Sequence, residues 1–167
     1  MYDVTYRYYV PLRVQRGYAS LSALYRAAKD IHARHERYGS RTQVYYLRDL
    51  DPSGADAARA AEQTILEMLL QMDSPAAHMV EFEILGVTPE QVSDWKLPSR
   101  PNKATDSRTA KFAHGQSVEL DAIPPKQLRK LVVDAITSHL SENEIAIHEA
   151  GVESTREYLR GLAEAAA

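Results

Sequence analysis

The sequence predicts an α/β protein: a mostly parallel sheet of about four strands flanked by helices, with a further helix at the C-terminus. Short β-prone runs alternate with helical patterns, which is typical of strand–helix–strand units. The 167 residues, 44% of them hydrophobic and 26% charged, suit one globular domain. An apolar run ends at two carboxylates, Asp49 and Asp51, and a Pro-Ser-Gly turn then opens an Ala-rich helix.

The first half of the chain is expected to form a strand–helix–strand unit and a second helix. Residues 10–14 are a predicted strand, and Ser20 can cap the following helix, which Gly39 ends. Residues 42–47 form the strand that leads into the two aspartates. A helical pattern then covers residues 55–72.

The second half opens with a strand over residues 80–85, where glutamates alternate with apolar residues and predict one polar face at a sheet edge. The remaining predicted elements are a short helix capped by Thr88, a long loop over 95–116, a strand over 117–120, a helix starting at Pro124 and Pro125, and a helix over 143–166. We expect one domain over residues 1–140, with 141–167 as its helical extension.

Composition excludes several classes of protein. The chain has no cysteine, which excludes disulfides, thiolate chemistry and cysteine-based zinc sites and fits a cytoplasmic protein. It has no uncharged apolar stretch near the roughly 18 residues of a membrane span, and residues 1–7 do not read as a signal peptide. We therefore expect no membrane association.

Charge is segregated along the sequence. Residues 1–48 carry nine Lys or Arg against three acids, whereas residues 49–94 carry ten acids and one Arg. Residues 95–140 are basic again, and residues 141–167 are acidic. An acidic strand end between basic flanks is the charge layout of a metal-dependent nucleic-acid site. The alternative is that these blocks carry no meaning once the chain folds.

Asp49 and Asp51 form the candidate metal site. Side chains alternate along a strand, so both carboxylates would point the same way at the edge where open α/β sheets bind ligands. Their mutual repulsion favours a cation or a set of donors, and hard oxygen ligands suit Mg²⁺, or Mn²⁺ in its place. The alternative is structural, because Asp51 in an Asp-Pro-Ser-Gly sequence can simply cap the following helix.

Glu119 and Asp121 repeat this alternating geometry at the end of the predicted fourth strand. Either could serve as a third metal ligand or a general base. The alternative is that Glu119 pairs with a basic loop residue and Asp121 caps the helix that begins at Pro124 and Pro125.

Basic residues in the long loop are candidate contacts for backbone phosphates of DNA, as is one further arginine at a strand end. The alternative is a solvated loop held by its own salt bridges. The candidates are Arg16, Lys96, Arg100, Lys103 and Arg108.

Residues 47–54, Leu-Arg-Asp-Leu-Asp-Pro-Ser-Gly, resemble the DxD motif of Toprim domains, in the form found in the A subunit of type IIB topoisomerases and related meiotic break-forming enzymes. Residues 16–22, 97–103 and 118–125 resemble blocks shared by bacterial and bacteriophage Toprim-like proteins. The resemblance covers roughly residues 8–140. It implies a Rossmann-like sheet, Mg²⁺ at Asp49 and Asp51, and strand cleavage or phosphoryl transfer on nucleic acid.

Toprim enzymes also use a glutamate on a first strand, and the DNA-cleaving members attack phosphate with a tyrosine from a separate domain. No glutamate occurs before Glu36, so we expect this chain to lack the strand that carries the third acid. A partner chain could supply the glutamate or the tyrosine.

Three functions follow from these patterns. The first is a Mg²⁺-dependent nuclease or topoisomerase-like fragment acting on DNA. The second is a module that binds DNA or a partner without cleaving. The third is an interaction protein that dimerises or docks through its acidic C-terminal helix, whose apolar stripe comprises Ile145, Val152, Leu159 and Leu162.

Overall fold

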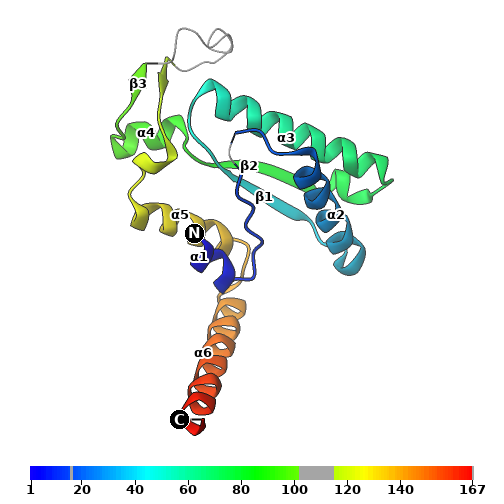
Figure 1. Ribbon diagram of the computed structural model, residues 1–167, viewed down its shortest axis with the longest axis vertical. Coiled ribbons are helices and arrows are strands. Elements are labelled where there is room, and N and C mark those ends of the chain that lie inside the picture. The colour runs from blue at the N-terminus through cyan, green and yellow to red at the C-terminus, as the bar shows by residue number, and fades with distance from the viewer. Residues whose placement is uncertain (16, 102–114, 167) are drawn as a thin grey trace. The chain divides into compact units, whose positions relative to one another are not determined.

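The computed structural model describes residues 1–15, 17–101 and 115–166 of a mixed α/β chain (Figure 1). The chain forms two compact units. The larger one runs from Val14 to Ile123, and the smaller one combines Met1–Arg13 with Pro124–Ala167.

The larger unit begins with α2 (Leu21–Tyr38), which is bounded as the sequence predicts. The hydroxyl of Ser20 accepts a hydrogen bond from the Ala23 amide at 3.3 Å, which satisfies one of the free donors of the first turn. Gly39 ends the helix in the left-handed region at φ 61°, which glycine adopts without steric cost. Strand β1 (Thr42–Leu47) follows.

Strands β1 and β2 (Val80–Gly86) pair in parallel, and α3 (Pro52–Gln71) connects them as a βαβ unit. Thr42 lies opposite Val80, and the register shifts after Tyr46 so that Leu47 lies opposite Gly86. The predicted strand over residues 10–14 is wrong, because the structure assigns no strand there and all five residues are exposed. Among the described residues no strand pairs with this segment, and Pro11 lacks an N–H.

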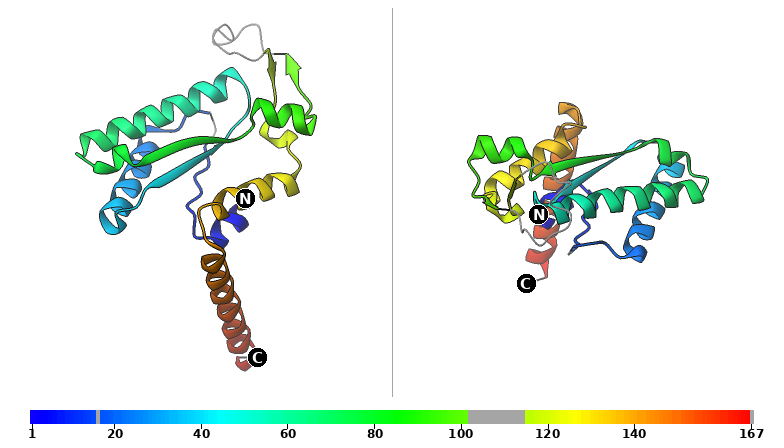
Figure 2. Two further views of the ribbon diagram at one scale, coloured as in Figure 1. Left: turned by 180° about the vertical axis from the view of Figure 1, so that it is seen from behind. Right: turned by 90° about the horizontal axis from the view of Figure 1, so that it is seen from above.

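The core of this unit lies between the two long helices and one face of the sheet (Figure 2). Ala28 and Ile31 of α2 pack with Ile65 and Leu69 of α3 and with Ala76, which lies in the 3₁₀ turn η1 (Pro75–His78). The sheet contributes alternate residues to this core, namely Val44, Val80 and Phe82. The period-2 burial of β2 confirms the amphipathic pattern read from the sequence.

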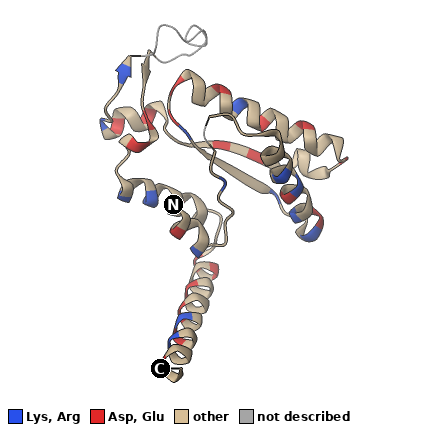
Figure 3. Cartoon of the chain, in the orientation of Figure 1, with Lys and Arg blue, Asp and Glu red and all other residues tan. Residues whose placement is uncertain are grey.

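The β2 residues that alternate with these core residues are acidic (Figure 3). Glu81 and Glu83 are both exposed. Arg41 lies 3.4 Å from the Glu81 carboxylate, and the Gln43 amide donates to Glu83 at 3.3 Å across the strand pair. The predicted polar face of this strand is therefore present.

The rest of the larger unit is made of short elements. A capping box of Thr88 and Gln91 opens α4 (Pro89–Trp95), as the threonine and proline predicted. Part of the predicted long loop forms an antiparallel pair of two-residue strands, β3 (Arg100–Pro101) and β4 (Gln116–Ser117). The predicted strand over 117–120 is shorter than expected, since the chain turns into a 3₁₀ helix, η3 (Leu120–Ala122).

The smaller unit contains α1 (Tyr2–Arg7), α5 (Pro125–Thr137) and α6 (Glu142–Ala165). Helix α5 and helix α6 lie where the sequence predicts them, whereas α1 was not predicted. Asp3 of α1 forms an ion pair with Arg129 of α5, and Arg7 forms one with Glu149 of α6 at 2.7 Å.

Candidate functional site

The backbone that carries the two aspartates is held on both sides of the acidic pair. Arg48 exchanges hydrogen bonds with the end of β2, donating to Gly86 at 2.6 Å and accepting from Val87 at 2.7 Å. Leu50 exchanges two backbone hydrogen bonds with Val118, of 2.8 and 3.0 Å, in an isolated antiparallel bridge. Leu50 is buried, so the residue between the two aspartates anchors them while Asp49 stays exposed.

Asp51 is the N-cap of α3. Its Oδ1 accepts a hydrogen bond from the Gly54 amide at 2.5 Å, and Pro52 occupies the first turn. The carboxylate also lies at the positive end of the helix dipole, where negative charge is stabilised. The capping role weighed from the sequence is therefore confirmed, and it uses one of the two carboxylate oxygens.

Asp49 also accepts a backbone hydrogen bond, but from a distant segment. Its Oδ1 lies 2.8 Å from the Leu120 amide nitrogen, which belongs to η3. This bond ties the end of β1 to the segment that carries Glu119. The two segments thus lie together, as expected from their alternating acids.

Arg48 directly precedes this acidic pair, and both carboxylates act on its charge. Burial lowers the pKa of its guanidinium, and the carboxylates of Asp51 and Asp49 oppose that shift by favouring the charged form. Its Nη1 donates to the Asp49 carbonyl at 2.9 Å, and its buried Nε has no hydrogen-bond partner among the described residues. Two backbone donors and one arginine therefore relieve the repulsion that favoured a cation at this position.

Glu119 and Asp121 take different roles. The Glu119 carboxylate pairs with Arg100, which lies opposite Ser117 in the β3–β4 ladder, so the expected pairing with a basic loop residue is present. Asp121 lies in η3 and is exposed. The expectation that it caps α5 is wrong, because Pro124 is the N-cap and no side chain bonds there.

Two of the five basic candidates lie in the described part of the chain. Lys96 is exposed and ends α4 in the left-handed region at φ 51°, and Arg100 is exposed in its pair with Glu119. The candidates Arg16, Lys103 and Arg108 lie outside the described residues. Among the residues that the structure describes, no group of three or more His, Asp or Glu is arranged to hold a metal ion.

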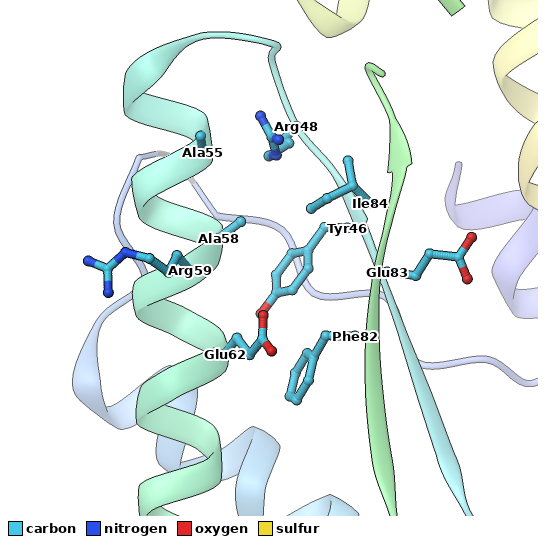
Figure 4. A pocket seen from close by; sticks show the side chains of 9 residues that line it. All are labelled: Tyr46, Arg48, Ala55, Ala58, Arg59, Glu62, Phe82, Glu83 and Ile84. Atoms are coloured by element: carbon cyan, nitrogen blue, oxygen red, sulfur yellow. The ribbon is translucent and has the colours of Figure 1, made fainter. Parts of the chain in front are cut away.

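A cavity of about 190 Å³ lies beside Arg48, between α3 and the two strands (Figure 4). This cavity was not predicted from the sequence. The available signal was the spacing of three and four residues that puts small Ala55 and Ala58 next to charged Arg59 and Glu62 on α3. The lining residues are Tyr46, Arg48, Ala55, Ala58, Arg59, Glu62, Phe82, Glu83 and Ile84.

The Tyr46 phenol is expected to ionise at a higher pH than an ordinary tyrosine does. Burial and the negative charge of Glu62 raise the pKa of Tyr46 to about 12. Because this pKa exceeds the value of about 10 in an unfolded chain, the phenol stabilises the fold below pH 10, and that contribution is lost as the pH rises through about 12. The measurement is an ultraviolet pH titration of the wild type and of Tyr46→Phe. The variant should lack the phenolate absorbance that the wild type gains at the highest pH. Tyr38→Phe, at an exposed position, is the control, and loss of the same phenolate signal from both variants would contradict the expectation.

No protein-family model, curated protein or solved structure matches this chain. None of the described helices has both the length and the apolar character that crossing a membrane requires.

Proposed function

We propose that this chain is a Toprim-like protein that holds Mg²⁺, or Mn²⁺, at Asp49 and Asp51 and nicks DNA or transfers phosphoryl groups on it. The observation that carries the proposal is the position of the two carboxylates, which follow β1 at the strand-to-helix junction of a parallel βαβ unit. Ligands of open α/β sheets bind at this end of the strands. The Toprim assignment adds the expectation of a sheet of about four strands, of which β1 and β2 would be two.

The donor set fits a hard cation. Each aspartate uses its Oδ1 for a backbone N–H, so Oδ2 is the oxygen with which it would bind metal. Mg²⁺ needs only one or two carboxylates because it retains several waters. We expect Asp49, the more exposed of the two, to be the direct ligand and Asp51 to hold a metal-bound water. A cation at this position would supply charge stabilisation for phosphate oxygens and an activated water.

The second candidate is a module that binds DNA or a partner without cleaving it. Arg48 and the amides of Gly54 and Leu120 already compensate the acidic pair, which weakens the need for a cation. In the described part of the chain, Glu119 is committed to Arg100. A protein with this arrangement could keep the fold and the basic loop while losing turnover.

Nicking of supercoiled plasmid in Mg²⁺ or Mn²⁺ tests the first candidate. We expect the wild type to nick, and we expect Asp49→Asn and Asp51→Asn to lose nicking. Asparagine keeps both structural roles, because its amide oxygen accepts the same backbone hydrogen bonds and it caps helices about as well as aspartate. Loss of activity would then follow from loss of charge at the metal. Asp94→Asn removes an exposed acid from α4 and should nick like the wild type.

No nicking by the wild type, or equal nicking by the asparagine variants, would reject the enzyme. DNA binding measured by fluorescence anisotropy at several salt concentrations then decides on the second candidate. Binding should persist in the asparagine variants and weaken when Arg100, Lys103 and Arg108 are changed to Gln, with a shallower salt dependence as phosphate contacts are lost. Arg34→Gln, on α2, is the matched control. Equal binding by the triple variant would exclude the loop as the interface.

A further inference from the structure

Helix α6 carries a heptad pattern that the proposed DNA function does not use. Residues at alternating spacings of three and four lie on one stripe, as at the a and d positions of a coiled coil. We call this stripe the α6 seam. Its members are Ile145, His148, Val152, Thr155, Leu159 and Leu162.

The chain covers only the first part of the α6 seam. The ring of Tyr8 stacks on His148 with the ring centroids 5.4 Å apart, and Tyr9 meets the same ring edge-on at 5.8 Å. Further along the helix, Leu159 is 57% exposed and Leu162 is 49% exposed. No residue of this 24-residue helix is buried in the described structure. Helices in water are stabilised chiefly by packing an apolar face, and among the described residues the end of the seam at Leu159 and Leu162 stays exposed.

The charges beside the seam identify the orientation of a partner helix. Glu144 and Glu149 flank its first half and Arg156 flanks its second half, at the positions that face a partner across a coiled coil. Two parallel copies would place Glu144 of one chain next to Glu149 of the other. Two antiparallel copies would place Glu149 of each chain next to Arg156 of the other, so the pair forms twice, once on each side of the twofold axis.

We infer that α6 pairs with α6 of a second copy of this chain as an antiparallel coiled coil. In the register that joins Glu149 to Arg156, Val152 packs on Thr155 and Ile145 on Leu162 of the second copy, while Leu159 of the second copy faces His148 and the Tyr9 ring that lies against it. Glu149 can serve both contacts, because its Oε1 accepts from Arg7 and a carboxylate has a second oxygen that can accept from another donor. Exposed Tyr9 beside His148 extends the apolar surface on which Leu159 of the second copy would rest.

Sedimentation equilibrium across a range of protein concentrations tests the dimer. We expect a dimer for the full chain and a monomer for the double variant Leu159→Glu and Leu162→Glu. Both leucines are exposed in the single chain, so these changes leave its fold intact, which circular dichroism can verify. Ile147→Glu changes an exposed apolar residue of α6 outside the seam and should remain dimeric. A monomeric wild type, or a dimeric double variant, would overturn the inference.

Orientation is tested separately. Arg156→Glu should weaken the dimer, and adding Glu149→Arg should restore it, because the swap recreates both interchain pairs. The absence of native cysteine permits a second readout. Leu162→Cys alone should not form a disulfide, since about 17 residues of helix rise, or roughly 25 Å, separate the two thiols in the antiparallel pair. A mixture of Ile145→Cys and Leu162→Cys chains should cross-link, and cross-linking of Leu162→Cys with itself would show a parallel pair instead.

Discussion

Leu69→Ala should lower the free energy of unfolding of the larger unit by about 2 to 5 kcal/mol, the range for truncating a buried leucine. Leu69 has no exposed surface and packs in the core with Ile65, Ala28, Ile31 and Ala76. The change removes apolar contacts and leaves a cavity that the neighbouring α2 and α3 cannot fill without moving. A loss of this size is a large part of the total stability of an ordinary domain.

Urea unfolding followed by the fluorescence of Trp95 measures this effect. Trp95 is the single tryptophan and lies in the same unit, so its signal follows the unfolding of that unit. Leu70→Ala is the matched control, because it removes the same atoms from a side chain that is 55% exposed. We expect the control to differ from the wild type by no more than about 0.5 kcal/mol. Equal losses for the two variants would mean that α3 does not pack by the face described.

The helices of the larger unit were predictable because their signals are local. Ser20 and Gly39 bound α2 through a hydroxyl and a left-handed backbone that act within one turn. Thr88 and Gln91 open α4 in the same way. In each case the residues that set the helix boundary lie within four positions of it, so the local sequence is enough to predict that boundary.

The wrong or missing elements depend on residues far apart in the chain. Residues 10–14 have β-prone side chains, but a strand also requires a partner, and no strand of the described part of the chain pairs with them. Helix α1 has only six residues, too few to be stable alone, and its ion pairs reach Arg129 and Glu149. These long-range contacts cannot be predicted from the spacing of residues along the sequence.

In the candidate site, too, the local features were predictable and the contacts between distant residues were not. The carboxylates follow β1 as predicted, and the capping bond of Asp51 to Gly54 follows from a local motif. The donor to Asp49 is Leu120, which is 71 positions away and could not be read from the sequence. Electrostatic relief by Arg48 depends on how deeply that side chain is buried, which is also set by the tertiary fold.

Gly54→Ala should destabilise the strand-to-helix junction, although alanine is normally the better helix former. The φ of Gly54 lies outside the left-handed region, so the backbone itself would accept a side chain. A Cβ at this position would lie 2.7 Å from the carbonyl oxygen of Asp49 and 3.1 Å from Oδ1 of Asp51. The first contact is with backbone and cannot be relieved by a rotamer change. Overpacking of this kind costs about 1 to 3 kcal/mol, which exceeds the gain of roughly 0.5 to 1 kcal/mol expected for alanine in a helix.

The matched control is Gly161→Ala, since a Cβ added to this α6 glycine would meet nothing within 4 Å. Circular dichroism should show that Gly161→Ala gains helicity or stability, whereas Trp95 fluorescence should show Gly54→Ala unfolding at lower urea. Stabilisation by Gly54→Ala would contradict the close approach of Asp49 to the first turn of α3. Because both displaced oxygens belong to the acidic pair, Gly54→Ala should also weaken Mg²⁺ binding by isothermal titration calorimetry if the proposed metal site is correct. Stability and metal affinity would then fall together, since a Cβ on this glycine would displace the Asp49 backbone and the Asp51 carboxylate at once.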